Sequence, residues 1–112
     1  MKICITAEGE TLDSPVDNRF GRCQYLQILD SETLEGTCEE NALRDGQGGI
    51  GIQVAQDLVQ QGVETVITGN MGPNAAEVLE IAGIPIYAAD SQTVEQAVED
   101  LQQGHLRQIG LE

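Results

Sequence analysis

Apolar and polar positions follow two different periods along this chain, and the change of period predicts its elements. Before residue 40 the pattern is typical of short strands, at residues 2–6 and 23–29 and, more weakly, at 33–39, with the turn Asp30-Ser31-Glu32 joining the last two. From residue 50 helical and strand patterns alternate, so we expect helices at 50–61, 73–82 and 94–103 and strands at 63–68 and 84–87. Such alternation requires parallel strands joined by crossovers, whereas the first half is typical of antiparallel pairing. The order β-β-β-α-β-α-β-α predicts an α/β fold on a five-stranded mixed sheet.

Start and stop signals frame the predicted helices. A glycine follows the last periodic residue of each helix, where a left-handed backbone favours this residue: Gly62, Gly83 and Gly104. Pro73 stands in the first turn of the second helix, and Thr93 with Gln96 predicts a capping box at the start of the third. Pro85 cannot donate a ladder hydrogen bond, so it marks either a sheet edge or the start of a strand.

Three predicted loops are expected to gather on one side of the sheet, because the carboxyl ends of parallel strands meet there and ligands usually bind in that crevice. They span residues 7–21, 69–74 and 88–92. The first contains Asp17-Asn18-Arg19-Phe20-Gly21-Arg22-Cys23, which holds two of the five Lys and Arg residues, the only Phe and one of the three Cys of a chain with net charge -14. This concentration of scarce cations predicts a place that holds an anion or a metal species.

The overall charge and length limit the classes of protein to consider. Nineteen Asp and Glu against five Lys and Arg disfavour attachment to nucleic acid or to an anionic membrane, because both need a cationic face. A chain of 112 residues with 40% hydrophobic content predicts a single domain over residues 1–112. The N-terminal apolar run is too short for a signal peptide and no apolar stretch is long enough to span a bilayer, so we expect a cytoplasmic protein.

The cysteines form no recognisable metal or redox motif. Cys4, Cys23 and Cys38 contain no Cys-x-x-Cys pair. Cys4 and Cys38 lie in strand-like apolar surroundings, which predicts small buried side chains. Cys23 adjoins Arg22 and ends a loop, so two interpretations stay open: a ligand with a lowered thiol pKa, or the first core residue of the next strand.

A glycine-rich turn precedes the first predicted helix. Gly46, Gly48 and Gly51 formally match G-x-G-x-x-G, but an antiparallel strand precedes them and no acidic residue ends the next strand, which disfavours a dinucleotide site. Backbone N–H groups at a helix start attract anions, and Arg44 lies close by; a plain connection to the helix is the alternative. We find no nucleophile paired with a base, and the only histidine, His105, follows the last helix, so we expect no enzyme and no catalytic residue.

Five segments together resemble the dinitrogenase iron-molybdenum cofactor-binding family, which includes NifX and NifY proteins and the C-terminal part of many NifB proteins. They are residues 17–22, Asn41, and residues 48–51, 62–72 and 83–87. The resemblance covers essentially the whole chain. It implies a ribonuclease H-like three-layer fold with helices on both faces of the sheet. It also implies non-catalytic binding or carrying of an iron-molybdenum cofactor, its precursor or another metal-sulfur cluster such as a molybdenum-copper sulfide.

The resemblance also implies a cluster site, formed by Arg19, Phe20, Gly21, Arg22, Cys23, Gln47, Gly48, Gly49 and Gly72. Many relatives carry a histidine shortly before the glycines, where this chain has Gln47, which cannot replace an imidazole ligand. Metal ligation would then fall on Cys23 alone, or Arg19, Arg22 and helix N-terminal amides would hold a polyanionic cluster without covalent bonds. Implied partners are the cluster itself and proteins that donate or accept it. The alternative is a protein-interaction or regulatory module of the same fold that has no cluster.

Overall fold

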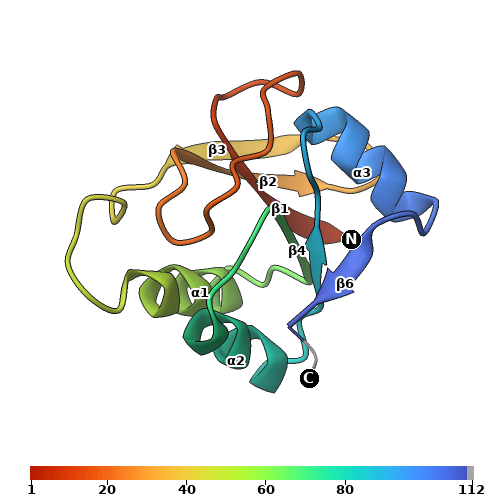
Figure 1. Ribbon diagram of the computed structural model, residues 1–112. Coiled ribbons are helices and arrows are strands. Elements are labelled where there is room, and N and C mark those ends of the chain that lie inside the picture. The colour runs from red at the N-terminus through yellow and green to blue at the C-terminus, as the bar shows by residue number, and fades with distance from the viewer. Residues whose placement is uncertain (111–112) are drawn as a thin grey trace.

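A six-stranded mixed sheet forms the centre of the computed structural model, which describes residues 1–110 (Figure 1). The strands are β1 (Lys2–Ala7), β2 (Tyr25–Asp30), β3 (Gly36–Glu40), β4 (Thr65–Thr68), β5 (Ile86–Ala88) and β6 (Arg107–Ile109). The helices are α1 (Ile50–Gln60), α2 (Pro73–Ile81) and α3 (Val94–Gln102). The strand order is β3-β2-β1-β4-β5-β6. β1 pairs antiparallel with β2 and parallel with β4, so the two halves of the chain meet at β1.

The predicted mixed sheet is confirmed, but the count of five strands is wrong. The additional strand is β6, which pairs antiparallel with β5 at the edge of the sheet. Its residues are mostly exposed, and they show no alternation of apolar and polar side chains that would predict a strand. Pro85 precedes β5, which lies between β4 and β6, so this proline marks the start of a strand and not a sheet edge.

Helices cover both faces of the sheet, as predicted, with α1 and α2 on one face and α3 on the other (Figure 1). Alternate residues of β1 point to opposite faces. The larger core cluster lies under α1 and α2 and includes Cys4, Leu26, Val54, Leu58, Val66 and Leu79. The smaller cluster lies under α3 and includes Ile3, Ile5, Ile67, Val94, Ala97 and Val98. Within residues 1–110, no helix has the length and apolarity that crossing a membrane requires.

The predicted helix signals are confirmed. The glycines after the three helices have left-handed backbones, with φ of 77°, 78° and 75° at Gly62, Gly83 and Gly104. At the start of α3 the Thr93 hydroxyl accepts from the Gln96 N–H at 3.2 Å, and the Gln96 side chain accepts from the Thr93 N–H at 3.1 Å.

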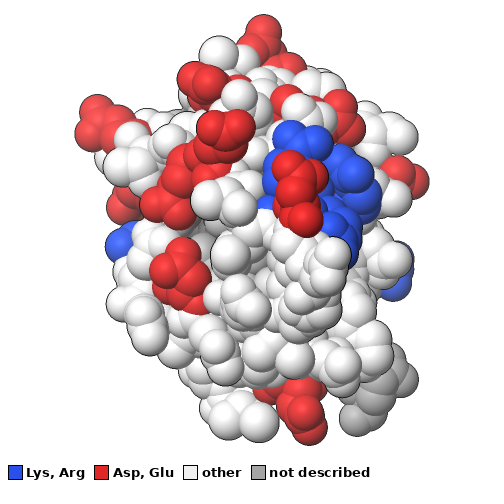
Figure 2. Space-filling model, turned by 90° about the vertical axis from the view of Figure 1, so that its left-hand side faces the viewer, with Lys and Arg blue, Asp and Glu red and all other residues white. Residues whose placement is uncertain are grey.

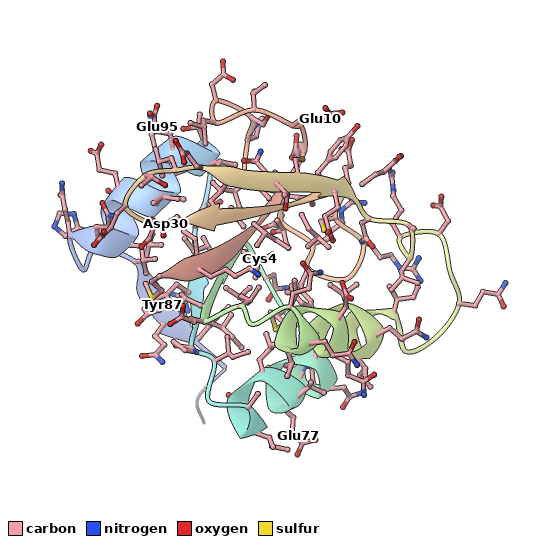
Figure 3. The ribbon with its side chains drawn as sticks, turned by 180° about the vertical axis from the view of Figure 1, so that it is seen from behind. Cys4, Glu10, Asp30, Glu77, Tyr87 and Glu95 are labelled. Carbon is pink, nitrogen blue, oxygen red and sulfur yellow. The ribbon has the colours of Figure 1, made fainter. Side chains whose placement is uncertain are left out.

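The prediction that Cys4 and Cys38 are both buried is half right. Cys4 is a residue of β1 and lies in the larger core cluster (Figure 3). Cys38 is exposed, because it lies on β3, an edge strand that pairs only with β2. An edge strand of a sheet can expose a small apolar residue that the same sequence pattern would bury in a central strand.

Candidate functional site

Two adjoining hollows lie where the loop after β1, the turn before α1 and the start of α2 meet. One, of about 230 Å³, is lined by Phe20, Gly21, Gly49, Ile50, Gly51, Ile52, Gly72, Pro73, Asn74 and Ala75. The other, of about 330 Å³, is lined by Arg19, Gly21, Arg22, Gly48, Gly49, Ile50 and Gly51. The shared residues make them one continuous surface, which we call the glycine hollow. Among the described residues no Asp or Glu lines it, although the chain has nineteen.

A larger hollow elsewhere has the opposite character. It measures about 510 Å³ and lies beside Lys2 and Gly36. Three carboxylates line it, from Asp30, Glu35 and Glu39. It therefore suits an anion poorly, and size alone does not identify the candidate site.

The helices α1 and α2 present uncapped N-termini to the glycine hollow. Their N-cap residues are Gly49 and Gly72, which have no side chain to accept a hydrogen bond, and neither first turn contains an acidic residue. The N–H groups at the start of each helix have no partner within the helix, and they add to the partial positive charge of the helix end. Two such ends converge on one hollow, which is a favourable arrangement for an anion.

The start of α3 is built differently. Thr93 caps it, Glu95 lies in its first turn, and the N–H groups of Val94 and Glu95 donate to the carbonyls of Ser14 and Leu12, both at 2.9 Å. These donors are therefore satisfied inside the protein. The first N–H groups of α1 stay available to a ligand, as do those of Asn74 and Ala75 in α2, whose first residue, Pro73, has no N–H.

The buried Asp17 organises the loop after β1. Its carboxylate is 2% exposed and accepts from the main-chain N–H groups of Arg19 and Gln24, both at 3.0 Å. It also accepts from the Arg19 guanidinium at 3.2 and 3.4 Å, and this hydrogen bonding and charge raise the pKa of Arg19. Sequence reasoning missed this role, although an acidic residue two positions before Arg19 was a usable signal.

Gly21 and Phe20 bring the loop onto α1. A Cβ on Gly21 would lie 2.9 Å from the Cα and 3.0 Å from the N of Gly51, so only a glycine allows this approach. Phe20 is 3% exposed, and it belongs to the larger core cluster while it also touches the hollow. The loop is thus anchored in the core on one side of the hollow.

Cationic side chains gather at this side of the molecule. Figure 2, seen from the left-hand side of Figure 1, shows most of the Lys and Arg atoms of this face in one patch, with acidic atoms in the middle of the patch and over much of the surface around it. Arg19 and Arg22 line the hollow. The Arg22 guanidinium donates to the carbonyls of Arg44 at 2.6 Å and Gly46 at 3.2 Å.

Cys23 lies in the core and not in the hollow. It is fully buried, and the Asn41 side-chain nitrogen lies 3.7 Å from its sulfur. Burial raises the pKa of Cys23 to about 12, with the nearby Asp17 carboxylate adding to the shift, so the sulfur stays a neutral thiol. Of the two interpretations of this residue, the structure agrees with a core position.

The other predicted site residues divide between the hollow and the surface. Seven line the glycine hollow: Arg19, Phe20, Gly21, Arg22, Gly48, Gly49 and Gly72. Gln47 is exposed outside it. Residues 1–110 contain no group of three or more His, Cys, Asp or Glu that could hold a metal ion.

These features define a mixed α/β protein whose candidate site offers backbone amides and arginines in place of metal ligands. A family model described as dinitrogenase iron-molybdenum cofactor matches residues 1–104, and the chain belongs to this family. The resemblance seen in the sequence is thereby confirmed.

Individual relatives agree with the family assignment over most of the chain. An uncharacterized protein of Methanocaldococcus jannaschii is 30% identical, with 85% of this chain and 87% of that protein covered. The apo form of the orange protein from Desulfovibrio gigas has a similar structure, with a TM-score of 0.90, 35% identity, and 96% and 92% of the two chains covered. A putative NifB protein from Thermotoga gives a TM-score of 0.84 at 35% identity, covering 99% of this chain and 95% of its own.

Proposed function

We propose that this protein binds and carries an anionic metal-sulfur cluster in the glycine hollow and does not catalyse a reaction. The cargo would be an iron-molybdenum cofactor, a precursor of it or another molybdenum, iron or copper sulfide. The observation that carries the proposal is the convergence of two uncapped helix N-termini on a hollow without carboxylates. Membership of the family supports it. A ribonuclease H-like classification of the fold and a cytoplasmic location belong to the same proposal.

The residues of the hollow fit a cluster held by hydrogen bonds and charge. Glycines at five positions of the lining leave the main chain open, so N–H groups can reach the surface of a large anion: Gly21, Gly48, Gly49, Gly51 and Gly72. Arg19 lies at the rim and stays protonated, although the Asp17 carboxylate paired with it offsets part of its charge. Since Cys23 is buried and protonated, the cargo would be held without a thiolate bond. A cluster bound in this way can leave without ligand exchange, as a carrier that serves donor and acceptor proteins requires.

A second candidate function is a protein-interaction or regulatory module of the same fold that has no cluster. The observation in its favour is the shortage of metal-ligating side chains at the hollow. Residues 1–110 have no cluster of three or more His, Cys, Asp or Glu that could hold a metal ion, and Gln47 stands where many relatives were expected to have a histidine. A site without strong metal ligands fits a protein that holds its anion loosely, and it fits equally well a protein that no longer binds a cluster. Uptake must therefore be measured.

Anaerobic titration distinguishes the two functions. We expect the purified protein to take up isolated iron-molybdenum cofactor, or the product of tetrathiomolybdate with copper, in a saturable, stoichiometric way, with charge-transfer absorption that stays with the protein during gel filtration. Arg19→Ala should weaken uptake, whereas Arg107→Ala, which removes a cation outside the hollow, should not. A folded protein that takes up neither anion would support the interaction module.

A further inference from the structure

The side chain of Arg22 lies at the glycine hollow, but its hydrogen bonds go to the protein. One guanidinium nitrogen donates to the Arg44 carbonyl at 2.6 Å and another to the Gly46 carbonyl at 3.2 Å. The two acceptors come 22 and 24 residues later in the chain, so Arg22 joins the loop after β1 to the turn before α1. A planar guanidinium can serve two carbonyls at once, which the compact ammonium group of lysine does less well.

Asn41 makes a second connection at the beginning of the same turn. It is 3% exposed, and its side-chain nitrogen donates to the carbonyls of Gly21 at 2.9 Å and Cys23 at 3.1 Å. Its side-chain oxygen accepts from the Leu43 N–H at 3.1 Å. Both ends of residues 41–46 are therefore tied to the loop that carries Arg19 and Gly21.

Between this turn and α1 the main chain makes few contacts. Gln47 is exposed, and Gly48 and Gly49 have left-handed φ of 65° and 67°. Among the described residues, no atom beyond the chain neighbours lies within 4 Å of the position where a Cβ on either glycine would be. Their place at the wall of the hollow is thus set by Gly46 on one side and by the buried Ile50 on the other.

We propose that Arg22 is a positioning residue and not a contact to the bound anion. Together with Asn41 it latches residues 41–46 onto the loop after β1, and this fixes the wall of the hollow that Gly48 and Gly49 form. Arg19 also lines the hollow, and its guanidinium is paired with the Asp17 carboxylate, so its contribution to binding would be a charge that Asp17 partly offsets. The effect on uptake depends on the proposed function, but the latch itself is a property of the protein without ligand.

Hydrogen exchange of the ligand-free protein tests the latch directly. The Arg44 and Gly46 N–H groups donate to the Asn41 and Leu43 carbonyls at 3.2 and 3.0 Å, so they report on the order of the turn. We expect Arg22→Lys and Arg22→Gln to speed exchange of both amides by roughly tenfold or more, because both variants lose the pair of hydrogen bonds that the guanidinium donates. Arg19→Lys should leave them unchanged. Unchanged exchange in both Arg22 variants would overturn the latch.

Uptake of tetrathiomolybdate separates positioning from direct charge. Arg22→Lys keeps the charge but loses the double hydrogen bond, so we expect it to lose about as much affinity as Arg22→Gln. At Arg19 the lysine variant should retain more affinity than Arg19→Gln. An Arg22→Lys protein with wild-type affinity and wild-type exchange would make Arg22 a charge contact and refute the proposal. If the wild-type protein takes up neither tetrathiomolybdate nor the two anions of the titration above, the proposed function has failed while hydrogen exchange still decides on the latch.

Discussion

Replacing Gly21 by alanine tests whether the loop after β1 rests directly on the start of α1. The new Cβ would lie 2.9 Å from the Cα and 3.0 Å from the N of Gly51, and both are main-chain atoms. Carbon atoms in contact are about 3.5 to 4.0 Å apart, so the loop or the helix must move by roughly 0.5 to 1 Å. Gly21 is not among the residues with positive φ, so the contact itself is the source of the strain.

The expected cost follows from this displacement. Overpacking of this kind costs about 1 to 3 kcal/mol, and we expect Gly21→Ala to lower the free energy of unfolding by that amount. Gly21 lines both parts of the glycine hollow, so the same shift moves the loop relative to the N–H groups of α1. A loss of about 1.4 kcal/mol of binding energy corresponds to a tenfold weaker complex, and we expect cluster uptake to weaken by at least about that factor.

Urea unfolding of the ligand-free protein, followed by circular dichroism, measures the first effect. Gly72→Ala is the matched control, because Gly72 has φ of -70° and no atom within 4 Å of a new Cβ. Its cost should stay below about 1 kcal/mol, the effect of losing a glycine N-cap. A Gly21→Ala protein as stable as the wild type, with normal uptake, would refute the close packing of the loop on α1.

Two further predictions concern the charge at the hollow and the thiols. Asn74→Asp places a carboxylate in the first turn of α2, where it should stabilise the ligand-free protein by about 0.3 to 1 kcal/mol, measured by thermal unfolding. The same carboxylate should weaken cluster uptake, and undiminished uptake would contradict an anion site there. Iodoacetamide at pH 8, followed by mass spectrometry, should modify Cys38 in the native protein and Cys23 and Cys4 only after unfolding. With the pKa of Cys23 raised to about 12, roughly one molecule in ten thousand carries the reactive thiolate at that pH, so labelling of Cys23 at the rate of Cys38 would contradict its place in the core.

The elements that could be predicted are those whose signals lie in neighbouring residues. The helix expected at 94–103 is Val94–Gln102 in the structure, because Thr93 and Gly104 specify its two ends locally. β6 could not be predicted, since an edge strand is held by main-chain hydrogen bonds to β5 and needs no regular side-chain pattern. The exposed Cys38 has the same cause, because the position of β3 at an edge is set by strand order and not by its own residues.

The position of the hollow was predictable where it depends on strand ends and glycines, and its lining was unpredictable where it depends on the direction of a side chain. The loop before Cys23 and the turn at Gly49 meet as expected, but residues 88–92 do not line the hollow. Instead, the Gln92 carbonyl accepts from the Val16 N–H at 2.9 Å. The sequence also left open whether Cys23 faces the loop or the core. The acceptors of Arg22 are far away in the sequence, so no local pattern indicates them.

The acidic surface and the glycine hollow are two parts of one electrostatic arrangement. An anion near a chain of net charge -14 is repelled over much of the surface, and Figure 3 shows Glu10, Glu77 and Glu95 projecting from separate elements. This repulsion acts over the Debye length, about 8 Å at physiological ionic strength, whereas N–H groups act at contact. If the hollow binds an anion as proposed, carboxylates elsewhere would suppress unspecific binding of anions, and the hollow would gain selectivity from repulsion around it as well as from attraction inside it. The proposed site would then tolerate the partial neutralisation of Arg19 by Asp17, because two helix ends supply positive potential and neither first turn contains an acidic residue.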